Sequence, residues 1–218
     1  DLAESLEQFH ATSAATALAT RLAAKIKTAT PTLSMLSVRG MMVHSAKWTP
    51  EMIRIGNIKD IIPLCGYGVP DEETALFSNE KYATFIFENE LIPYWEKDGS
   101  NTYNQLHFYD LPWPTEVLEQ MGEENVKIRI TLSYYVKPSP GYAGRSNKYR
   151  YPSATLHFDL KSASESMEEF LCRRNKSEGE KRTDNDTNRW TIKQQRREQG
   201  TVQSDWIECT AAELASCG

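Results

Sequence analysis

Hydrophobic positions in the N-terminal part of the chain recur at helical spacing. Leu18, Leu22 and Ile26 stand four residues apart among alanines, which predicts a buried helix over residues 14–27. A second apolar pattern predicts a helix over residues 33–46. The sequence therefore opens with two packed helices.

A helix start signal follows at Thr49-Pro50-Glu51, where a hydroxyl N-cap precedes a proline and an acid. It predicts a third helix over residues 50–61. The glycine-rich run at 66–71 predicts a turn, and residues 71–76 a short helix after it.

The pattern then changes from helical to alternating. Residues 126–137 alternate apolar and polar side chains without interruption, which predicts a half-buried antiparallel strand. Residues 156–160 repeat this period. Residues 81–92 and 105–109 have the β-branched and aromatic character of strands. Residues 81–161 therefore predict most of an antiparallel β-sandwich.

The C-terminal part is mixed. We expect a helix over residues 164–175, a mobile charged loop over 175–189, and short strands at 190–192 and 202–209. A helical pattern follows at 210–214.

Composition narrows the class of protein. The chain has 39% hydrophobic and 25% charged residues, as an ordinary globular protein does, and its net charge of −5 argues against a nucleic-acid-binding surface. No apolar run approaches the roughly 20 residues that cross a bilayer, so no membrane span is expected. The four cysteines are too far apart for a metal-binding pair, which predicts free thiols and no metal or other cofactor. They are Cys65, Cys172, Cys209 and Cys217.

The strongest candidate for chemistry is Ser13. It lies at the start of the first predicted helix, where unpaired backbone N–H groups and the positive end of the helix dipole stabilise developing negative charge. A serine there is often only a cap, so the position alone does not establish catalysis.

The residues around Ser13 resemble the serine motif of the subtilisin-like serine peptidases (subtilases), Gly-Thr-Ser-x-Ala-x-Pro. Thr12, Ser13 and Ala15 match the motif. Ala11 stands where the family has glycine, and Ala17 where it has proline. Alanine continues a helix well, so the second departure is the less serious one.

The resemblance continues downstream. Residues 38–46 are similar to the second subtilase helix, and residues 66–71 to the Gly-x-Gly turn near the end of the catalytic domain. Residues 107–114 resemble the β domain that follows in a group of bacterial subtilases.

The resemblance implies an α/β fold followed by a β-sandwich. Residues 1–80 would be the C-terminal, mostly helical part of a subtilisin-like catalytic domain, and residues 81–218 a β-rich domain. The chain would then be a fragment of a longer peptidase.

The implied reaction is peptide hydrolysis through an acyl-enzyme on Ser13, with the Ser13 backbone N–H as an oxyanion donor. In subtilases the aspartate, the histidine and the oxyanion asparagine precede the serine, so all three would lie upstream and this chain alone would be inactive. The family further implies a protein or peptide substrate, a cytoplasmic location and a possible ATPase partner.

Two other functions stay open. The chain could be a non-catalytic module that binds a protein or glycan through its aromatic residues, or a degenerate pseudo-peptidase in view of Ala11. His10 is a poor base for Ser13 because it comes from the same segment. A triad formed within the chain is disfavoured, since the other histidines are expected in the core or on the surface. They are His44, His107 and His157. We expect Arg196 and Arg197 to lie in a solvated loop.

Overall fold

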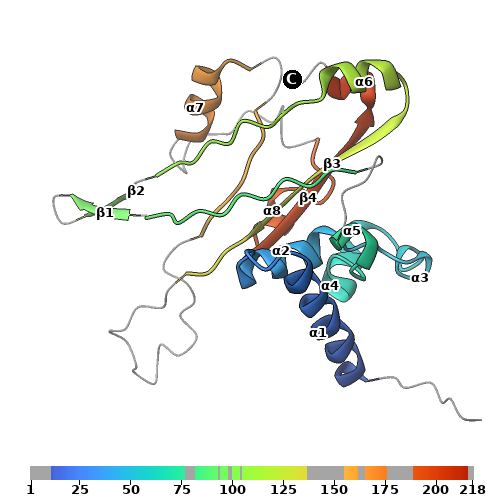
Figure 1. Ribbon diagram of the computed structural model, residues 1–218. Coiled ribbons are helices and arrows are strands. Elements are labelled where there is room, and N and C mark those ends of the chain that lie inside the picture. Colours follow the sequence, from blue (N-terminus) through green and yellow to red (C-terminus); the bar gives the residue numbers. More distant parts are fainter. Residues whose placement is uncertain are drawn as a thin grey trace, which may run out of the picture. The chain divides into compact units, whose positions relative to one another are not determined.

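The computed structural model shows the chain as two compact units, Asp1–Glu88 and Asn89–Gly218 (Figure 1). It describes residues 11–76, 82–92, 94–97, 100–103, 105–136, 155–161, 165–175 and 189–215. The predicted assignment of residues 1–80 and 81–218 to a catalytic and a β-rich domain stays a prediction.

The described part of the first unit is helical. Its helices are α1 (Thr12–Ala29), α2 (Met35–His44), α3 (Pro50–Ile53), α4 (Ile58–Cys65) and α5 (Glu72–Leu76). The predictions of a first helix, a second helix and a short helix before residue 77 are confirmed by α1, α2 and α5.

The predicted single helix over residues 50–61 is wrong. Thr49 caps α3 as expected, and its side chain accepts a hydrogen bond from the Met52 N–H. The chain then breaks at Gly56, whose φ of 145° lies outside the helical range. Asn57 caps α4 by accepting from the Lys59 N–H at 2.9 Å.

A small apolar core joins α1, α2 and α5. It contains Leu22, Ile26, Leu33, Val38 and Ala75. Only the C-terminal half of α1 contributes to this core, because the first buried residue of that helix is Leu22.

The prediction that Leu18 belongs to a buried face is wrong for this chain. The Leu18 side chain is 63% exposed. Figure 1 shows the beginning of α1 extending beyond the ends of α2 and α5, so these helices do not cover it.

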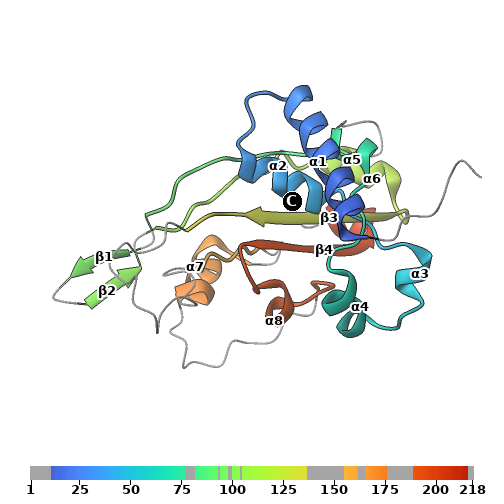
Figure 2. The same ribbon diagram turned by 90° about the horizontal axis from the view of Figure 1, so that it is seen from below.

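The second unit combines short helices with two-stranded sheets. Its elements are β1 (Tyr94–Lys97), β2 (Ser100–Tyr103), α6 (Thr115–Met121), β3 (Asn125–Ser133), α7 (Met167–Asn175), α8 (Gln194–Arg197), β4 (Val202–Thr210) and α9 (Ala211–Ala215). β3 pairs with β4 in antiparallel register, from Asn125 opposite Thr210 to Ser133 opposite Val202 (Figure 2). The predicted long strand near residue 130 and the strand at 202–209 are confirmed as a pair.

A second apolar core lies at one end of this ribbon, where α6 and α9 pack together. Its buried members are Leu118, Ala211, Leu214 and Ala215. The Trp113 indole N–H donates to the Leu214 carbonyl at 3.1 Å and so ties the segment before α6 to α9.

The β-sandwich is not shown. Within the described residues the two sheets, β1–β2 and β3–β4, are each two-stranded. Strands were predicted at residues 81–92, 105–109 and 156–160. In the structure, residues 83–92, 105–110 and 155–161 are extended but form no ladder with another described strand. The predicted mobile loop falls largely on residues 176–188, which lie outside the described residues.

Candidate functional site

Ser13 lies in the first turn of α1, two residues after the N-cap residue Ala11. The first intrahelical bonds run from the Ala14 and Ala15 N–H groups to the Ala11 carbonyl, at 3.1 and 3.4 Å. The N–H groups of Thr12 and Ser13 precede these bonds, so helix geometry gives them no acceptor within α1. The Ser13 side chain is exposed. A hydroxyl and two backbone donors therefore stand together at the positive end of an 18-residue helix.

The first turn of α1 carries no acidic side chain of its own. The N-cap residue makes no side-chain hydrogen bond. An acid here would partly neutralise the dipole and compete for the backbone N–H groups. The helix start is therefore suited to an anionic group supplied from outside the helix.

The two departures from the subtilase motif produce no backbone strain. Ala11 has φ −150° and ψ 147°, which is extended backbone that alanine adopts freely. Ala17 lies within α1, which continues unbroken to Ala29. In this conformation neither the glycine nor the proline of the motif is required.

The hydroxyls that follow Ser13 support the helix. Thr16 Oγ1 donates to the Thr12 carbonyl, and Thr20 Oγ1 to the Thr16 carbonyl, each at 2.8 Å. Bonds of this type satisfy the hydroxyl locally. The Ser13 hydroxyl has no such partner among the described residues. It is therefore available to react or to bind a ligand, whereas the hydroxyls of Thr16 and Thr20 are already hydrogen-bonded.

Within the first unit, the described residues bring no histidine to Ser13. His44 ends α2, and His157 pairs with Glu198 in the second unit, with 3.1 Å between Nδ1 and Oε2. His107 stands beside the Tyr109 ring, also in the second unit. His10, the nearest histidine in sequence, lies outside the described residues. Ser13, the nucleophile predicted from the sequence, therefore has no histidine beside it among the described residues of the first unit.

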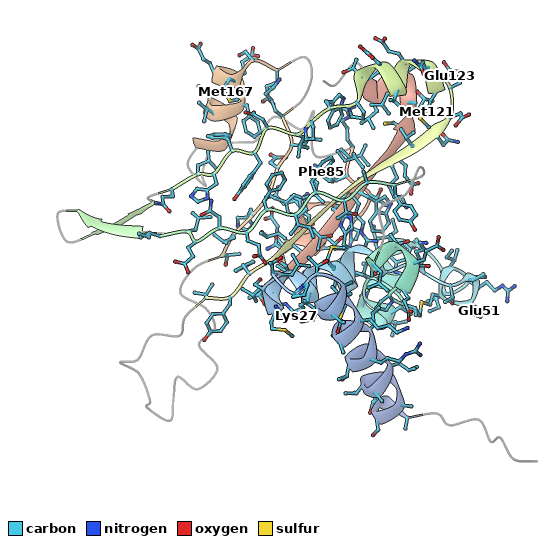
Figure 3. The ribbon with its side chains drawn as sticks, viewed as in Figure 1. Lys27, Glu51, Phe85, Met121, Glu123 and Met167 are labelled. Carbon is cyan, nitrogen blue, oxygen red and sulfur yellow. The ribbon has the colours of Figure 1, made fainter. Side chains whose placement is uncertain are left out.

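The opposite end of α1 is firmly anchored. The Lys27 ammonium donates to the carbonyls of Pro31 and Leu33 and closes the connection to α2 (Figure 3). Glu72 on α5 pairs with both Arg21 and Lys25. The helix that carries Ser13 is therefore fixed by its C-terminal half, and its first turns project from that support.

Carboxylates elsewhere in the first unit serve as helix caps. The Asp71 carboxylate accepts from the Thr74 N–H at 2.8 Å, which lowers the pKa of Asp71 and begins α5. Glu88 accepts from the Ser34 N–H at 2.8 Å and from the Ser37 hydroxyl, and these bonds lower the pKa of Glu88. Both groups stabilise helix starts and neither contacts Ser13.

The described residues contain no group of three or more His, Cys, Asp or Glu side chains that could hold a metal ion. Among the described helices, none is long and apolar enough to cross a bilayer. Among the described residues, Cys65, Cys172 and Cys209 form no disulfide.

One prediction about the second unit is wrong. Arg197 was expected in a solvated loop, but it is only 3% exposed. Its guanidinium lies over the rings of Phe158 and Trp190, 4.4 and 5.1 Å from their centroids. The sequence gives no distinctive signal for this burial, since Asp205 is one of two acids in β4 and the other, Glu208, is exposed.

The comparisons with known proteins concern the first unit. Residues 2–85 match the model of the subtilase family. No curated protein matches the chain, and no solved structure matches it. The match includes the serine motif, α1, α2 and the glycine turn, and it ends before the second unit begins. Residues 2–85 are therefore similar to the subtilases, a family of serine peptidases.

Proposed function

We propose that this chain carries the nucleophile of a subtilisin-type serine endopeptidase. In this proposal Ser13 Oγ attacks a peptide carbonyl and forms an acyl-enzyme, which water then hydrolyses. The observation that carries the proposal is the exposed hydroxyl of Ser13 in the first turn of α1, within a segment that matches the subtilase family.

The Ser13 backbone N–H serves as one oxyanion donor. It has no intrahelical acceptor, and no acidic side chain lies in the first turn. Such a donor stabilises the negative charge on the substrate oxygen as the tetrahedral intermediate forms.

The histidine, the aspartate and the oxyanion asparagine come from residues upstream of Asp1, which is the chain order of the family. This agrees with the absence of a histidine near Ser13 among the described residues of the first unit. Triad members act as a unit, so this chain alone hydrolyses peptides at a negligible rate. The substrate is a protein or peptide. Residues 81–218, as a β-rich domain, stabilise the catalytic part and help to dock the substrate.

The test is labelling with a fluorophosphonate probe, which reacts with activated serines. We expect no labelling of this chain alone, and labelling of the gene product extended upstream. Ser13→Ala should abolish labelling of the extended protein. Thr20→Ala removes another exposed hydroxyl on the same helix and should leave labelling unchanged.

Two outcomes would contradict the proposal. If the extended protein does not react with the probe, the pseudo-peptidase or binding-module function is favoured. Efficient Ser13-dependent labelling of this chain alone would show that the base lies within residues 1–218.

A further inference from the structure

The strongest unassigned feature is a set of buried polar side chains that hold an extended segment of the second unit. Residues 155–161 are extended and join no ladder with a described strand. Gln203 Nε2 donates to the Leu156 carbonyl at 2.8 Å, and Arg197 Nη2 donates to the Phe158 carbonyl at 3.4 Å. The segment is thus held by side-chain donors at alternate carbonyls, as a bound peptide is held.

The donors come from a rigid support. The Asp205 carboxylate on β4 accepts from the N–H groups of Ile192 and Lys193, at 2.8 and 3.1 Å. These bonds fix the turn that begins α8, where Lys193 has a φ of 71°. Arg197 at the end of α8 then lies with Nη1 3.7 Å from Asp205 Oδ2. The Arg197 guanidinium is therefore positioned by Asp205 on β4 and by Glu198 as well as by the segment that it contacts.

An aromatic contact adds side-chain selectivity. The Phe158 ring lies edge-on to Trp190, with 5.6 Å between centroids, and under the Arg197 guanidinium. Cation–π and edge-to-face contacts favour an aromatic residue at this position. The preceding residue, His157, faces Glu198 at the outer edge of the site and is partly exposed.

Residues 155–161 use only part of the hydrogen-bonding capacity of the Gln203 and Arg197 side chains. Gln203 is fully buried, and its Oε1 has no hydrogen-bond partner among the described residues. The Nε of Arg197 is likewise unpaired within the described part of the chain. A side-chain amide can bond both the C=O and the N–H of a peptide backbone. Here only its donor half is used.

We propose that Trp190, Arg197, Gln203 and Asp205 form a binding groove for an extended peptide from another polypeptide. Residues 155–161 occupy this groove from within the chain. The favoured ligand has an aliphatic residue two positions before an aromatic one, as Leu156 and Phe158 do. A peptide in slightly different register offers an N–H to Gln203 Oε1, which the internal segment does not.

The probe is a fluorescein-labelled peptide with the sequence of residues 155–161, and the readout is fluorescence anisotropy. Phe158→Ala in the full chain weakens the internal segment and leaves the groove side chains in place. We expect this variant to bind the peptide at least tenfold more tightly than the unaltered chain does. A peptide with alanine in place of its phenylalanine is the control and should bind at least tenfold more weakly.

A second substitution, in the groove itself, distinguishes specific peptide binding from nonspecific binding to a destabilised protein. Gln203→Met in the Phe158→Ala background keeps a side chain of similar volume but removes the amide, so it should lower affinity at least tenfold. If Phe158→Ala does not fold by circular dichroism, His157→Ala replaces it, since it removes only the outer ion pair with Glu198. The proposal is overturned if the opened variant binds no better than the unaltered chain, or if neither the alanine peptide nor Gln203→Met reduces binding.

Discussion

Replacing leucines at two positions of α1 tests whether only half of that helix is packed. Leu22 is 7% exposed and belongs to the core with Ile26 and Val38, whereas Leu18 is 63% exposed. Leucine to alanine removes three carbon atoms, or about 2.4 kcal/mol of transfer free energy at ~0.8 kcal/mol each. The cavity left in the core raises the expected cost of Leu22→Ala to about 3 kcal/mol.

Leu18→Ala should have a much smaller effect. The side chain is about one-third buried, so the lost transfer free energy is ~0.8 kcal/mol. Alanine has the higher helix propensity, which offsets a few tenths of this. We expect a net loss of about 0.5 kcal/mol in the free energy of unfolding.

The assay is urea denaturation followed by far-UV circular dichroism, with both variants in the same buffer. Equal losses for Leu18→Ala and Leu22→Ala would refute the exposure of the first half of α1. The same pair measured in the upstream-extended protein tests the proposed function. There the Leu18→Ala cost should exceed about 2 kcal/mol, because upstream residues would bury the first half of the helix. A cost that stays near its value in this chain would contradict that burial.

The remaining predictions concern the first unit and use urea denaturation. A Cβ at Gly68, where φ is +100°, would lie 2.2 Å from the Lys47 carbonyl oxygen, so Gly68→Ala should cost about 3 kcal/mol or more. Gly66→Ala is the control for backbone strain without a steric clash, since its φ of 56° and ψ of −134° are also unfavourable for alanine but nothing lies within 4 Å of an added Cβ, and it should cost about 2 kcal/mol; equal costs would show that the close approach to Lys47 is unimportant. Asp71→Ala removes the cap on the Thr74 N–H and should cost about 1 kcal/mol at pH 7. The folded pKa of Asp71 is below its usual value of 3.8, so the stabilisation is present above that pH and disappears as pH falls through the lower, folded pKa. An Asp71→Ala cost that stays constant down to pH 2 would contradict the role of its charge.

The helices of the first unit could be predicted largely because local signals agree with tertiary packing. Thr49 and Pro50 mark the start of α3 in sequence and in structure. The break at Gly56 was missed because the apolar periodicity continues across it, while a single residue at positive φ ends the helix.

The second unit was predicted less well because alternation indicates an extended chain but not its partner. The period of two correctly predicted β3, whose partner β4 follows about seventy residues later in the chain. The same period at 156–160 gave an extended segment held by side chains instead of a ladder. Burial of Arg197 depends on tertiary contacts with Phe158 and with Asp205 on β4, so no local pattern indicates it.

The candidate site was predictable to the level of one residue. The sequence places Ser13 at a helix start, and the structure adds that the hydroxyl is exposed and that Ala11 causes no strain. The partners of a nucleophile come from other segments of a fold, so a motif of a few residues does not locate them.

The central claim is that Ser13 is the nucleophile, and the most direct test is to locate the modified residue. The upstream-extended protein is treated with a fluorophosphonate, digested and analysed by tandem mass spectrometry. The account predicts that the phosphonyl group is found on Ser13 and not on Thr12 or Thr16. A modification elsewhere, or an extended protein that remains unmodified while a known serine peptidase reacts in parallel, would contradict it.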